Sequence, residues 1–379
     1  MDSREVRGKG RGWRDFGESD SSRDRDCLYD NCVVCPIEGV NFIRNRKGNL
    51  SVKYVNFGKA GVKVSPLALG LGFRGQGDAN EAQRLVEHAI DSGINLIDCA
   101  NIYGLMDDRA NIGRSEEILG KAMQGKRDDV VITSKVFSQI GPGPNDQGLS
   151  RYHIMREVER SLKRLNTDHI DIYLIHAPDE TTPQEETVRA MDDLVRSGKV
   201  RYIGCCNHQA WQACKALWIA DRINATPYMC IQNMYNLLNR DMETELFGLV
   251  REEGLGVMCY SPLAVGLLSG VYAPDEPPPA GTLWETRLRE EFAQRMRGET
   301  GQVIRTLKRL AAELDKTPAQ LAVAWVLSHP EVTVAISGSD TIEQLDDTLG
   351  GVGWELDAAV RQELDEVSSS FVRLIAPPA

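Results

Sequence analysis

The sequence predicts an α/β protein with a (β/α)8 TIM barrel, preceded by an N-terminal β-hairpin and an irregular N-terminal extension. Two observations carry this prediction. Short apolar runs alternate with amphipathic helical patterns through most of the chain, which is typical of a parallel sheet covered by helices. Eight such runs occupy roughly 290 residues, close to the usual size of about 250 residues for a closed barrel of eight strands.

The composition excludes several classes of protein. Of the 379 residues, 42% are hydrophobic and 26% are charged, with a net charge of −11 and scattered basic residues, which argues against nucleic acid as the main partner. No apolar run reaches about 18 residues, so we expect no transmembrane helix and no membrane partner. The N-terminus has no apolar stretch of the kind that signal peptides contain, so we expect a cytoplasmic protein. The oligomeric state stays open, because a closed barrel has no free sheet edge that must pair.

Residues 1–50 form a candidate N-terminal extension, and residues 51–379 form the predicted barrel domain. The extension is rich in Arg, Asp, Ser and Gly without hydrophobic periodicity, which is typical of a low-complexity, flexible segment. Cys27, Cys32 and Cys35 have a spacing that could bind a metal or part of an iron–sulfur cluster, but no fourth ligand is evident nearby. Free thiols are the favoured interpretation, and we expect no metal site. The other six cysteines fall in or near apolar runs, as expected for buried thiols in a reducing compartment.

The expected elements begin with the hairpin. Val52–Phe57 and Val62–Ser65, separated by a four-residue loop that contains two glycines, predict its two strands. The predicted barrel strands are Leu67–Phe73, Ile94–Ala100, Val130–Val136, Ile170–His176, Val200–Asn207, Met229–Asn236, Gly256–Leu263 and Val332–Gly338. The helical patterns include Ala82–Ser92, His153–Leu165, Thr187–Ser197, Trp211–Ile223, Val303–Leu314 and Asp357–Val367.

Four polar residues mark helix starts. Each is followed three residues later by Glu or Gln, the pattern of a capping box: Asp78, Thr182, Thr317 and Thr341. Two of them, Thr182 and Thr317, also precede a proline, which is favoured at the first helical position. The Pro-rich segment 264–300 is longer than a usual barrel loop, so we expect it to overhang one end of the barrel and to shape a substrate pocket.

A glycine-rich stretch after the first barrel strand admits two interpretations. Gly70, Gly72 and Gly75 match the G-x-G-x-x-G pattern of a Rossmann dinucleotide site, and Asp98 lies about twenty residues further on. In that site the last glycine opens the helix, so that the helix N-terminus holds the pyrophosphate. Here two more residues and the candidate cap Asp78 intervene. We therefore interpret the glycines as a loop that lines the mouth of the barrel.

Four ionisable residues recur at the ends of three consecutive predicted strands. Asp98 ends the second strand, and Tyr103 follows in the next loop. Lys135 lies near the end of the third strand, and His176 ends the fourth. Each has an ordinary structural role when considered alone, as a helix cap, a loop anchor, a strand-edge charge or a core histidine. Together they are expected at one site, because a parallel barrel gathers such residues at the carboxyl ends of its strands.

These four side chains suit proton donation to a carbonyl oxygen. Tyrosine is a weak acid with an ordinary pKa of about 10, but a nearby ammonium group stabilises the phenolate and lowers that pKa. Lys135 can supply this ammonium, held by the Asp98 carboxylate, and His176 can hydrogen-bond the substrate oxygen. None of these residues can supply a hydride, so the chemistry requires a nicotinamide cofactor.

The chain resembles the aldo-keto reductase superfamily, and most closely its bacterial sugar and small-carbonyl reductases and its potassium-channel β-subunits. The resemblance covers residues 52–367 and is carried by the motifs INLIDCANIYG, VITSKV, YLIHAPD, GCCNH, IQNMYNLLNR and YSPLAVGLLSG. It implies a barrel enzyme that reduces aldehydes or ketones, or oxidises alcohols, with NADPH more often than with NADH. The catalytic Asp, Tyr, Lys and His of the family fall on Asp98, Tyr103, Lys135 and His176.

The resemblance also implies a cofactor site along the strand ends. Asn207 and Gln232 match residues that hold the nicotinamide carboxamide, next to Cys206, and Tyr260 matches the aromatic residue on which the ring stacks. The other cofactor-binding residues that it implies are Gly72, Phe73, Asp98, Ser261, Leu263, Gly266, Leu267, Ser337, Gly338, Ser339, Asp340, Gln344, Asp347 and Thr348.

One position departs from the family pattern. After the last strand the family usually has Pro-Gly-x-Arg or Pro-Gly-x-Lys, whose basic residue holds the 2′-phosphate of NADPH, whereas this chain has Ser-Gly-Ser-Asp ending at Asp340. A carboxylate there would repel the phosphate and could accept hydrogen bonds from the ribose hydroxyls of NADH. Alternatively, Asp340 caps the helix that opens at Thr341, and Ser339 or an arginine elsewhere holds the phosphate. Both NADP(H) and NAD(H) therefore stay open.

The sequence constrains the substrate least. The residues expected at the pocket rim are Phe73, Arg74, Tyr103, His208, Tyr235 and Trp284. We expect a small-molecule carbonyl substrate, sugar-like or otherwise small and polar. A second interpretation is a nucleotide-sensing regulatory module on the same barrel with little turnover. The complete catalytic set favours the enzyme, because a binding role places no demand on Lys135 or Tyr103.

Overall fold

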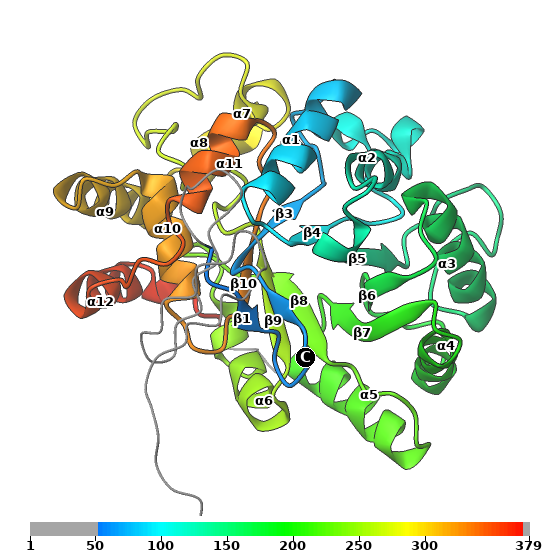
Figure 1. Ribbon diagram of the computed structural model, residues 1–379. Coiled ribbons are helices and arrows are strands. Elements are labelled where there is room, and N and C mark those ends of the chain that lie inside the picture. The colour runs from blue at the N-terminus through cyan, green and yellow to red at the C-terminus, as the bar shows by residue number, and fades with distance from the viewer. Residues whose placement is uncertain (1–51, 374–379) are drawn as a thin grey trace, which may run out of the picture.

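The computed structural model describes residues 52–373, and the N-terminal extension with Cys27, Cys32 and Cys35 lies outside the described residues. Within residues 52–373, eight parallel strands close into a barrel in the order β10-β3-β4-β5-β6-β7-β8-β9, and a ring of helices surrounds them (Figure 1). A separate antiparallel pair, β1 and β2, precedes the barrel. The predicted (β/α)8 TIM barrel with an N-terminal hairpin is therefore confirmed.

The strands lie where the sequence predicts them but are shorter. Their bounds are β1 Val55–Asn56, β2 Lys63–Val64, β3 Leu67–Gly70, β4 Leu96–Asp98, β5 Val131–Val136, β6 Ile170–Ile175, β7 Val200–Cys206, β8 Cys230–Met234, β9 Gly256–Tyr260 and β10 Val334–Ser337. Around β4, Ile94 and Ala100 are completely buried although they lie outside the ladder. The apolar runs report burial, which extends beyond the residues that pair with a neighbouring strand.

The helices fill the connections between the strands. Their bounds are α1 Ala79–Asp91, α2 Arg114–Ala122, α3 Arg151–Leu165, α4 Gln184–Arg196, α5 Ala210–Arg222, α6 Leu246–Glu253, α7 Leu283–Thr286, α8 Arg289–Arg295, α9 Glu299–Glu313, α10 Pro318–Leu327, α11 Ile342–Leu349 and α12 Ala358–Val367. The long segment 264–300 contains the short helices α7 and α8. Among the described residues, no helix combines the length and the apolar character that crossing a bilayer requires.

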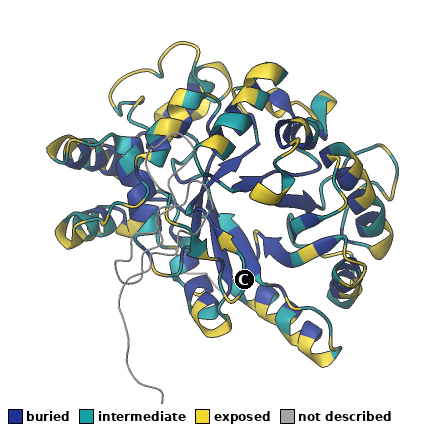
Figure 2. Ribbon diagram, in the orientation of Figure 1, coloured by how far each residue is buried: buried dark blue, intermediate teal, exposed yellow. Residues whose placement is uncertain are grey.

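The hairpin closes the amino end of the barrel. Phe57 and Val64 are completely buried and belong to the same apolar cluster as the barrel residues Leu96, Ile172 and Met258. The backbone N–H of Lys59 donates to the carbonyl of Gly254, just before β9 begins, at 2.9 Å. In the burial view the barrel strands are dark, whereas the surrounding helices carry exposed outer faces (Figure 2). Because the hairpin closes the amino end of the barrel, we expect a site at the carboxyl end of the strands.

Three of the four predicted helix caps are confirmed. Asp78, Thr317 and Thr341 each accept a hydrogen bond from a backbone N–H in the first turn of the following helix. The prediction for Thr182 is wrong, because its hydroxyl donates to a carboxylate oxygen of Asp179 at 2.8 Å and no side chain caps α4. Since Asp179 also accepts hydrogen bonds from two other residues, it draws Thr182 away from the helix.

The glycine-rich stretch after β3 forms a loop and does not open a helix. Helix α1 begins at Ala79, and its cap Asp78 accepts from the N–H groups of Asn80 and Glu81 at 2.7 and 3.2 Å. Gly75 lies in the preceding loop, so its backbone is separated from the helix N-terminus that would hold a pyrophosphate in a Rossmann site. The interpretation of this stretch as a barrel loop is confirmed.

Candidate active site

Three adjacent strands bring the four predicted catalytic side chains together. Asp98 ends β4, Lys135 lies in β5, and His176 directly follows β6. In the barrel register, Asp98 pairs with Thr133, and Lys135 pairs with Leu174, which places the strand ends side by side. Tyr103 reaches the same point from the loop after β4.

The four side chains form one chain of contacts. The ammonium of Lys135 lies 2.7 Å from a carboxylate oxygen of Asp98 and 3.3 Å from the hydroxyl of Tyr103. The same hydroxyl lies 3.3 Å from Nε2 of His176. Lys135 is completely buried, and Asp98 is 3% exposed, so the pair interacts where water screens it little. The carbonyl of Cys99 accepts a second hydrogen bond from the ammonium at 2.9 Å.

Burial sets the protonation of this group. Burial raises the pKa of Tyr103 to about 12, although the Lys135 ammonium acts in the opposite direction. Lys135 thus acts on this pKa in the predicted direction, but the net pKa lies above its ordinary value, because removing a phenolate from water costs more than the ammonium compensates. Burial, assisted by the charge of Lys135, lowers the pKa of His176 to about 3, so its imidazole is neutral at pH 7.

Lys135 keeps its charge despite its complete burial. Burial alone lowers the pKa of this side chain, but the nearby Asp98 carboxylate outweighs that effect, and the net pKa is raised. The other carboxylate oxygen of Asp98 accepts hydrogen bonds from the Thr133 hydroxyl at 2.5 Å and from Nε2 of Gln232 at 2.8 Å. Asp98 therefore accepts hydrogen bonds from Lys135, Thr133 and Gln232 and holds the three side chains together.

Thr133 is a site residue that the sequence reasoning missed. It lies two positions before Lys135 on the same strand, and alternate residues of a strand share a face. The two-residue period of a strand is enough to predict that both side chains face Asp98.

Tyr235 does not reach the pocket rim where it was expected, because it is completely buried and stacks on Trp325 with ring centroids 5.2 Å apart.

The side chains expected around a nicotinamide lie next to these four residues. Asn207, in the left-handed backbone region at φ 57°, donates to the carbonyl of His176 at 2.9 Å and accepts from the Tyr260 hydroxyl at 2.8 Å. Gln232 donates to Asp98 at 2.8 Å, and its carbonyl oxygen accepts a long hydrogen bond from the buried thiol of Cys206 at 3.8 Å.

The glycines after two strand ends leave open space that a bound ligand could occupy. A methyl group added to Gly72 or to Gly338 would meet no atom within 4 Å. These residues follow β3 and β10, which are neighbours in the barrel. Phe73 follows Gly72 with a positive φ of 44° and is 2% exposed. The open space and the polar groups beside it fit the nicotinamide cofactor that the sequence implies.

The loop after β9 carries backbone strain. Ser261, Ala264 and Val265 have positive φ values of 55°, 47° and 57° although none is a glycine. Such conformations cost about 1 to 3 kcal/mol each and cluster at ligand-binding sites. Asn236 holds the loop by donating to the carbonyl of Ser261 at 2.9 Å. The loop contains four of the implied cofactor-binding residues, Ser261, Leu263, Gly266 and Leu267.

Three of the implied cofactor-binding residues at and after the end of β10 form a buried cluster of hydroxyl groups. Ser337, Ser339 and Thr348 are buried and share hydrogen bonds, with the Ser337 hydroxyl 2.7 Å from that of Ser339 and 3.0 Å from that of Thr348. Asp347 accepts from the Thr317 hydroxyl at 2.7 Å. The three hydroxyls of the cluster thus form hydrogen bonds with one another.

Asp340 bridges two loops at the mouth of the barrel. One of its carboxylate oxygens accepts from the N–H of Gly75 at 2.9 Å, and its backbone carbonyl accepts from the Gln76 side chain at 2.9 Å. Its backbone N–H donates to Gln344, also at 2.9 Å. The alternative that Asp340 caps α11 is wrong, because the side chain of Thr341 fills that role.

The second carboxylate oxygen of Asp340 is buried, and no described residue hydrogen-bonds to it. Burial raises the pKa of Asp340, while the N–H of Gly75 and the positive charges of Arg74 and Arg287 act against that rise. Asp340 therefore presents a carboxylate oxygen in need of a donor, in a region that two arginines make less negative.

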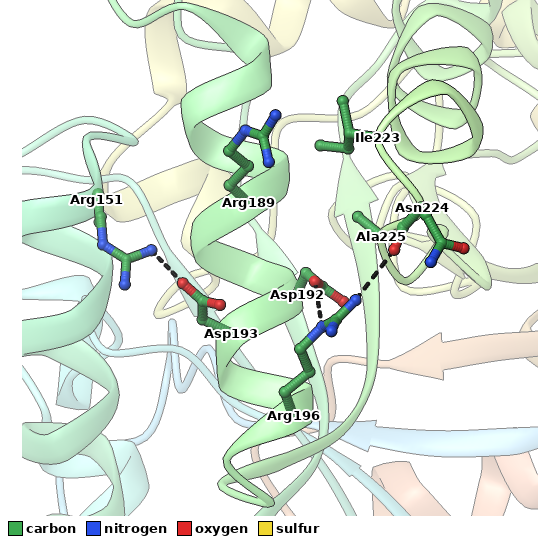
Figure 3. A pocket seen from close by; sticks show the side chains of 8 residues that line it. All are labelled: Arg151, Arg189, Asp192, Asp193, Arg196, Ile223, Asn224 and Ala225. Atoms are coloured by element: carbon green, nitrogen blue, oxygen red, sulfur yellow. Dashed lines mark hydrogen bonds and ion pairs between the residues drawn. The ribbon is translucent and has the colours of Figure 1, made fainter.

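A separate hollow lies on the outer wall of the barrel, between α3, α4 and the end of α5 (Figure 3). Its charged side chains pair with one another, as Arg151 with Asp193 and Arg196 with Asp192. It contains none of the predicted site residues, and the paired arginines leave little net charge for a ligand. Among the described residues, no cluster of His, Cys, Asp and Glu could hold a metal ion.

Comparisons with known proteins identify one family that this chain resembles over most of its length. The model of the Aldo/keto reductase family matches residues 66–369. An uncharacterized oxidoreductase of Bacillus subtilis is 39% identical over 324 residues, which cover 83% of this chain and 96% of the relative. A probable voltage-gated potassium channel subunit beta of Oryza sativa is 39% identical, covering 78% of this chain and 89% of the relative. The corresponding Arabidopsis thaliana protein is 37% identical, covering 79% and 91%.

Proposed function

This chain belongs to the aldo/keto reductase family, and on that basis we propose that it is an NAD(P)H-dependent carbonyl reductase. It reduces an aldehyde or ketone, sugar-like or otherwise small and polar, to the alcohol. The observation that carries the proposal is the Tyr103 hydroxyl, which lies 3.3 Å from both the Lys135 ammonium and Nε2 of His176. A binding protein would not need a buried ammonium beside a tyrosine hydroxyl.

Each residue has one role in the proton transfer. Tyr103 gives its proton to the carbonyl oxygen, and the Lys135 ammonium stabilises the phenolate that remains. Asp98 keeps Lys135 charged and in place at 2.7 Å. Neutral His176 presents Nε2 to the same point, where it can hydrogen-bond the carbonyl oxygen and orient it.

The nicotinamide supplies the hydride when it is bound. Asn207 and Gln232, whose oxygen has only a weak thiol donor in Cys206, would hold its carboxamide, and Tyr260 would support the ring. Both amide side chains are already oriented by hydrogen bonds within the protein, at 2.9 Å for Asn207 and 2.8 Å for Gln232, which reduces the entropy lost on binding.

The Tyr103→Phe variant tests the proposal. We expect aldehyde turnover to fall by about 10²- to 10⁴-fold, because the phenyl ring cannot donate a proton. The dissociation constant of the cofactor, followed through tryptophan fluorescence, should stay within about two-fold of the wild type, since the hydroxyl contributes to the chemistry and little to cofactor binding. A variant that keeps the wild-type kcat would remove Tyr103 from the mechanism.

We further propose that the chain has a weaker preference for NADPH than is usual in its family. Asp340 replaces the basic residue, and its buried carboxylate oxygen without a partner suits a ribose hydroxyl better than a phosphate. Arg74 and Arg287, whose charges act on Asp340, are the candidates to hold a phosphate if one binds. Titration of the protein with NADPH and with NADH gives the two dissociation constants. If the constant for NADPH is far smaller than the constant for NADH, the proposal is wrong.

A regulatory module with slow turnover is the second candidate function. Two of the similar proteins are probable potassium channel beta subunits, which favours a binding role on this barrel. The two candidates differ in turnover: the enzyme should reduce members of an aldehyde panel with a kcat of about 1 s⁻¹ or more. Cofactor binding without such turnover would favour the regulatory module.

A further inference from the structure

A second layer of buried polar groups lies behind the active site, between the barrel and helices α2 and α3. Neighbouring residues of a strand point to opposite faces, so Lys135 faces Asp98 inside the barrel and Ser134 faces outward. The Ser134 hydroxyl donates to Glu116, completely buried on α2, at 2.5 Å. Arg164 on α3 donates to the other oxygen of Glu116 at 2.6 Å.

The loop that carries Tyr103 is attached to the same layer. Asn101 lies two residues before Tyr103 and donates from its side-chain amide to Glu157 on α3 at 3.1 Å. Asn101 is completely buried and Glu157 is 1% exposed. Glu157 therefore contacts the catalytic loop although it touches none of the four catalytic side chains.

The first turn of α2 holds the other end of this loop. The backbone N–H of Ser115 donates to the carbonyl of Tyr103 at 3.3 Å, and its hydroxyl donates to the carbonyl of Ala100, also at 3.3 Å. Helix α2 follows Gly113 without a side-chain cap, so a free N–H of its first turn is satisfied by the catalytic loop. The path from Asn101 to Tyr103 is thus attached at both ends.

Glu157 is an expensive residue to bury. Its main ionic partner is Arg160 at 2.8 Å, and the Arg160 side chain is 46% exposed. A buried carboxylate with a partly solvated partner recovers only part of its desolvation cost, so stability alone does not account for it. What Glu157 does accomplish is to hold Asn101, and with it the start of the loop that ends at Tyr103.

We propose that Glu157 is a positioning residue for proton transfer: through Asn101, it holds the loop between β4 and α2 so that the Tyr103 hydroxyl stays 3.3 Å from Lys135 and from His176. This inference rests on the proposed reductase function. Contacts of 3.3 Å are at the long end for a hydrogen bond, so a small outward shift of the loop would break both. A misplacement of about 1 Å at a reacting group can cost about 10²-fold in rate.

The orientation of the Asn101 amide makes the contact testable. Its nitrogen faces Glu157, and its oxygen is buried with no hydrogen-bond partner among the described residues. Asn101→Asp keeps the shape but places two carboxylates against each other. Glu157→Gln keeps an oxygen that accepts from Asn101. The double variant Asn101→Asp, Glu157→Gln exchanges donor and acceptor and restores the hydrogen bond.

The test measures kcat per cofactor-binding site, the cofactor dissociation constant and the substrate KM for these variants. We expect Asn101→Asp to lower kcat by about 10²-fold, with the cofactor dissociation constant and KM within about two-fold. Glu157→Gln should stay within about three-fold of the wild-type kcat, and the exchanged pair should recover about ten-fold over Asn101→Asp. A merely structural role would change the fraction of sites that bind cofactor but leave kcat per site unaltered.

Glu157→Met is a second variant, chosen because we expect it to fold. It removes the acceptor and the buried charge at similar volume, and it leaves no buried cation unpaired, because half-exposed Arg160 can turn to water. We expect a folded protein with the same loss of kcat as Asn101→Asp, and Arg160→Ala should remain near the wild type. A wild-type kcat per site in Glu157→Met would overturn the proposal.

A crystal structure of Glu157→Met separates this inference from the proposed function. If the wild-type protein reduces no carbonyl compound, the reductase proposal fails, but the distance from the Tyr103 hydroxyl to the Lys135 nitrogen still reports on positioning. We expect that distance to exceed its present 3.3 Å in the variant. An unchanged distance would show that Glu157 does not hold the loop.

Discussion

Tyr103 illustrates how competing effects at one residue decide its chemistry. The Lys135 ammonium lies 3.3 Å from its hydroxyl and favours the phenolate, yet burial has the larger effect and raises the pKa to about 12. For reduction this direction is useful, because the acid must be protonated at neutral pH. The contribution of Lys135 is then to stabilise the phenolate as it forms.

The pKa values at the site predict a flat pH profile for reduction. Tyr103, with its pKa near 12, stays protonated below about pH 11, and His176, with its pKa near 3, stays neutral above about pH 4. We therefore expect kcat/KM for the aldehyde, which reports the groups of the enzyme before the aldehyde binds, to change less than about two-fold from pH 5 to pH 10. An acidic limb with a midpoint near pH 6.5 would show that His176 titrates as an ordinary histidine.

Asp340 is the residue at which cofactor preference can be changed. Asp340→Arg should tighten NADPH binding about ten-fold relative to NADH, because a guanidinium forms paired hydrogen bonds with a phosphate. The control is Asp340→Asn, which keeps an oxygen for the N–H of Gly75 but removes the charge. Fluorescence titrations with both cofactors measure the ratio. If the two variants shift it equally, charge removal rather than phosphate binding is responsible.

Helix starts show where local patterns suffice at the level of a secondary-structure element. The pattern at Thr317 was predicted as a capping box, and both of its hydrogen bonds are present. The same pattern at Thr182 fails, because Asp179 binds its hydroxyl. A capping pattern is reliable only where no stronger acceptor lies within reach.

The cap at Thr317 gives a prediction for helix α10. Thr317→Ala should lower the free energy of unfolding by about 1 kcal/mol, because the N–H of Gln320 loses its acceptor. Thr317→Ser keeps the hydroxyl and should stay within about 0.5 kcal/mol of the wild type. Urea unfolding of both variants checks this. Equal losses in the two variants would assign the effect to the methyl group and its packing.

For the molecule as a whole, Arg240 connects the C-terminal helix to the barrel. Its guanidinium donates to the carbonyl of Asp365 at 2.7 Å and to the hydroxyl of Ser368 at 2.8 Å, and it forms two hydrogen bonds with Glu243. The guanidinium also lies over the ring of Trp325, 5.3 Å from its centroid. The hydrogen bonds to Asp365 and Ser368 join positions more than a hundred residues apart in the sequence.

Arg240→Met should lower the free energy of unfolding by about 3 kcal/mol, because it removes these hydrogen bonds and takes from Glu243 the cation that pairs with it. Arg240→Lys keeps the charge but cannot reproduce the forked geometry, so an intermediate loss is expected. Chemical denaturation of the full chain measures both. A loss below about 0.5 kcal/mol in Arg240→Met would show that the C-terminal helix is held by its apolar contacts alone.

The fold and the grouping of the four catalytic candidates could be predicted from the sequence, and the reason is local. Strand and helix periods depend on residues close together in the chain, and a parallel barrel then gathers the strand ends at one edge. This was enough to place Asp98, Lys135 and His176 side by side. It also rejected the Rossmann interpretation of the loop at Gly75.

What depended on the three-dimensional packing was the partner and the solvation of each polar group. The pKa of Tyr103 rises because the folded barrel removes water from its hydroxyl, and Tyr235 is buried because Trp325, ninety residues later in the sequence, stacks on it. Asp340 binds Gly75, from which 265 positions separate it. No pattern within a short window contains such information, because desolvation and long-range hydrogen bonds come into being only when distant segments meet.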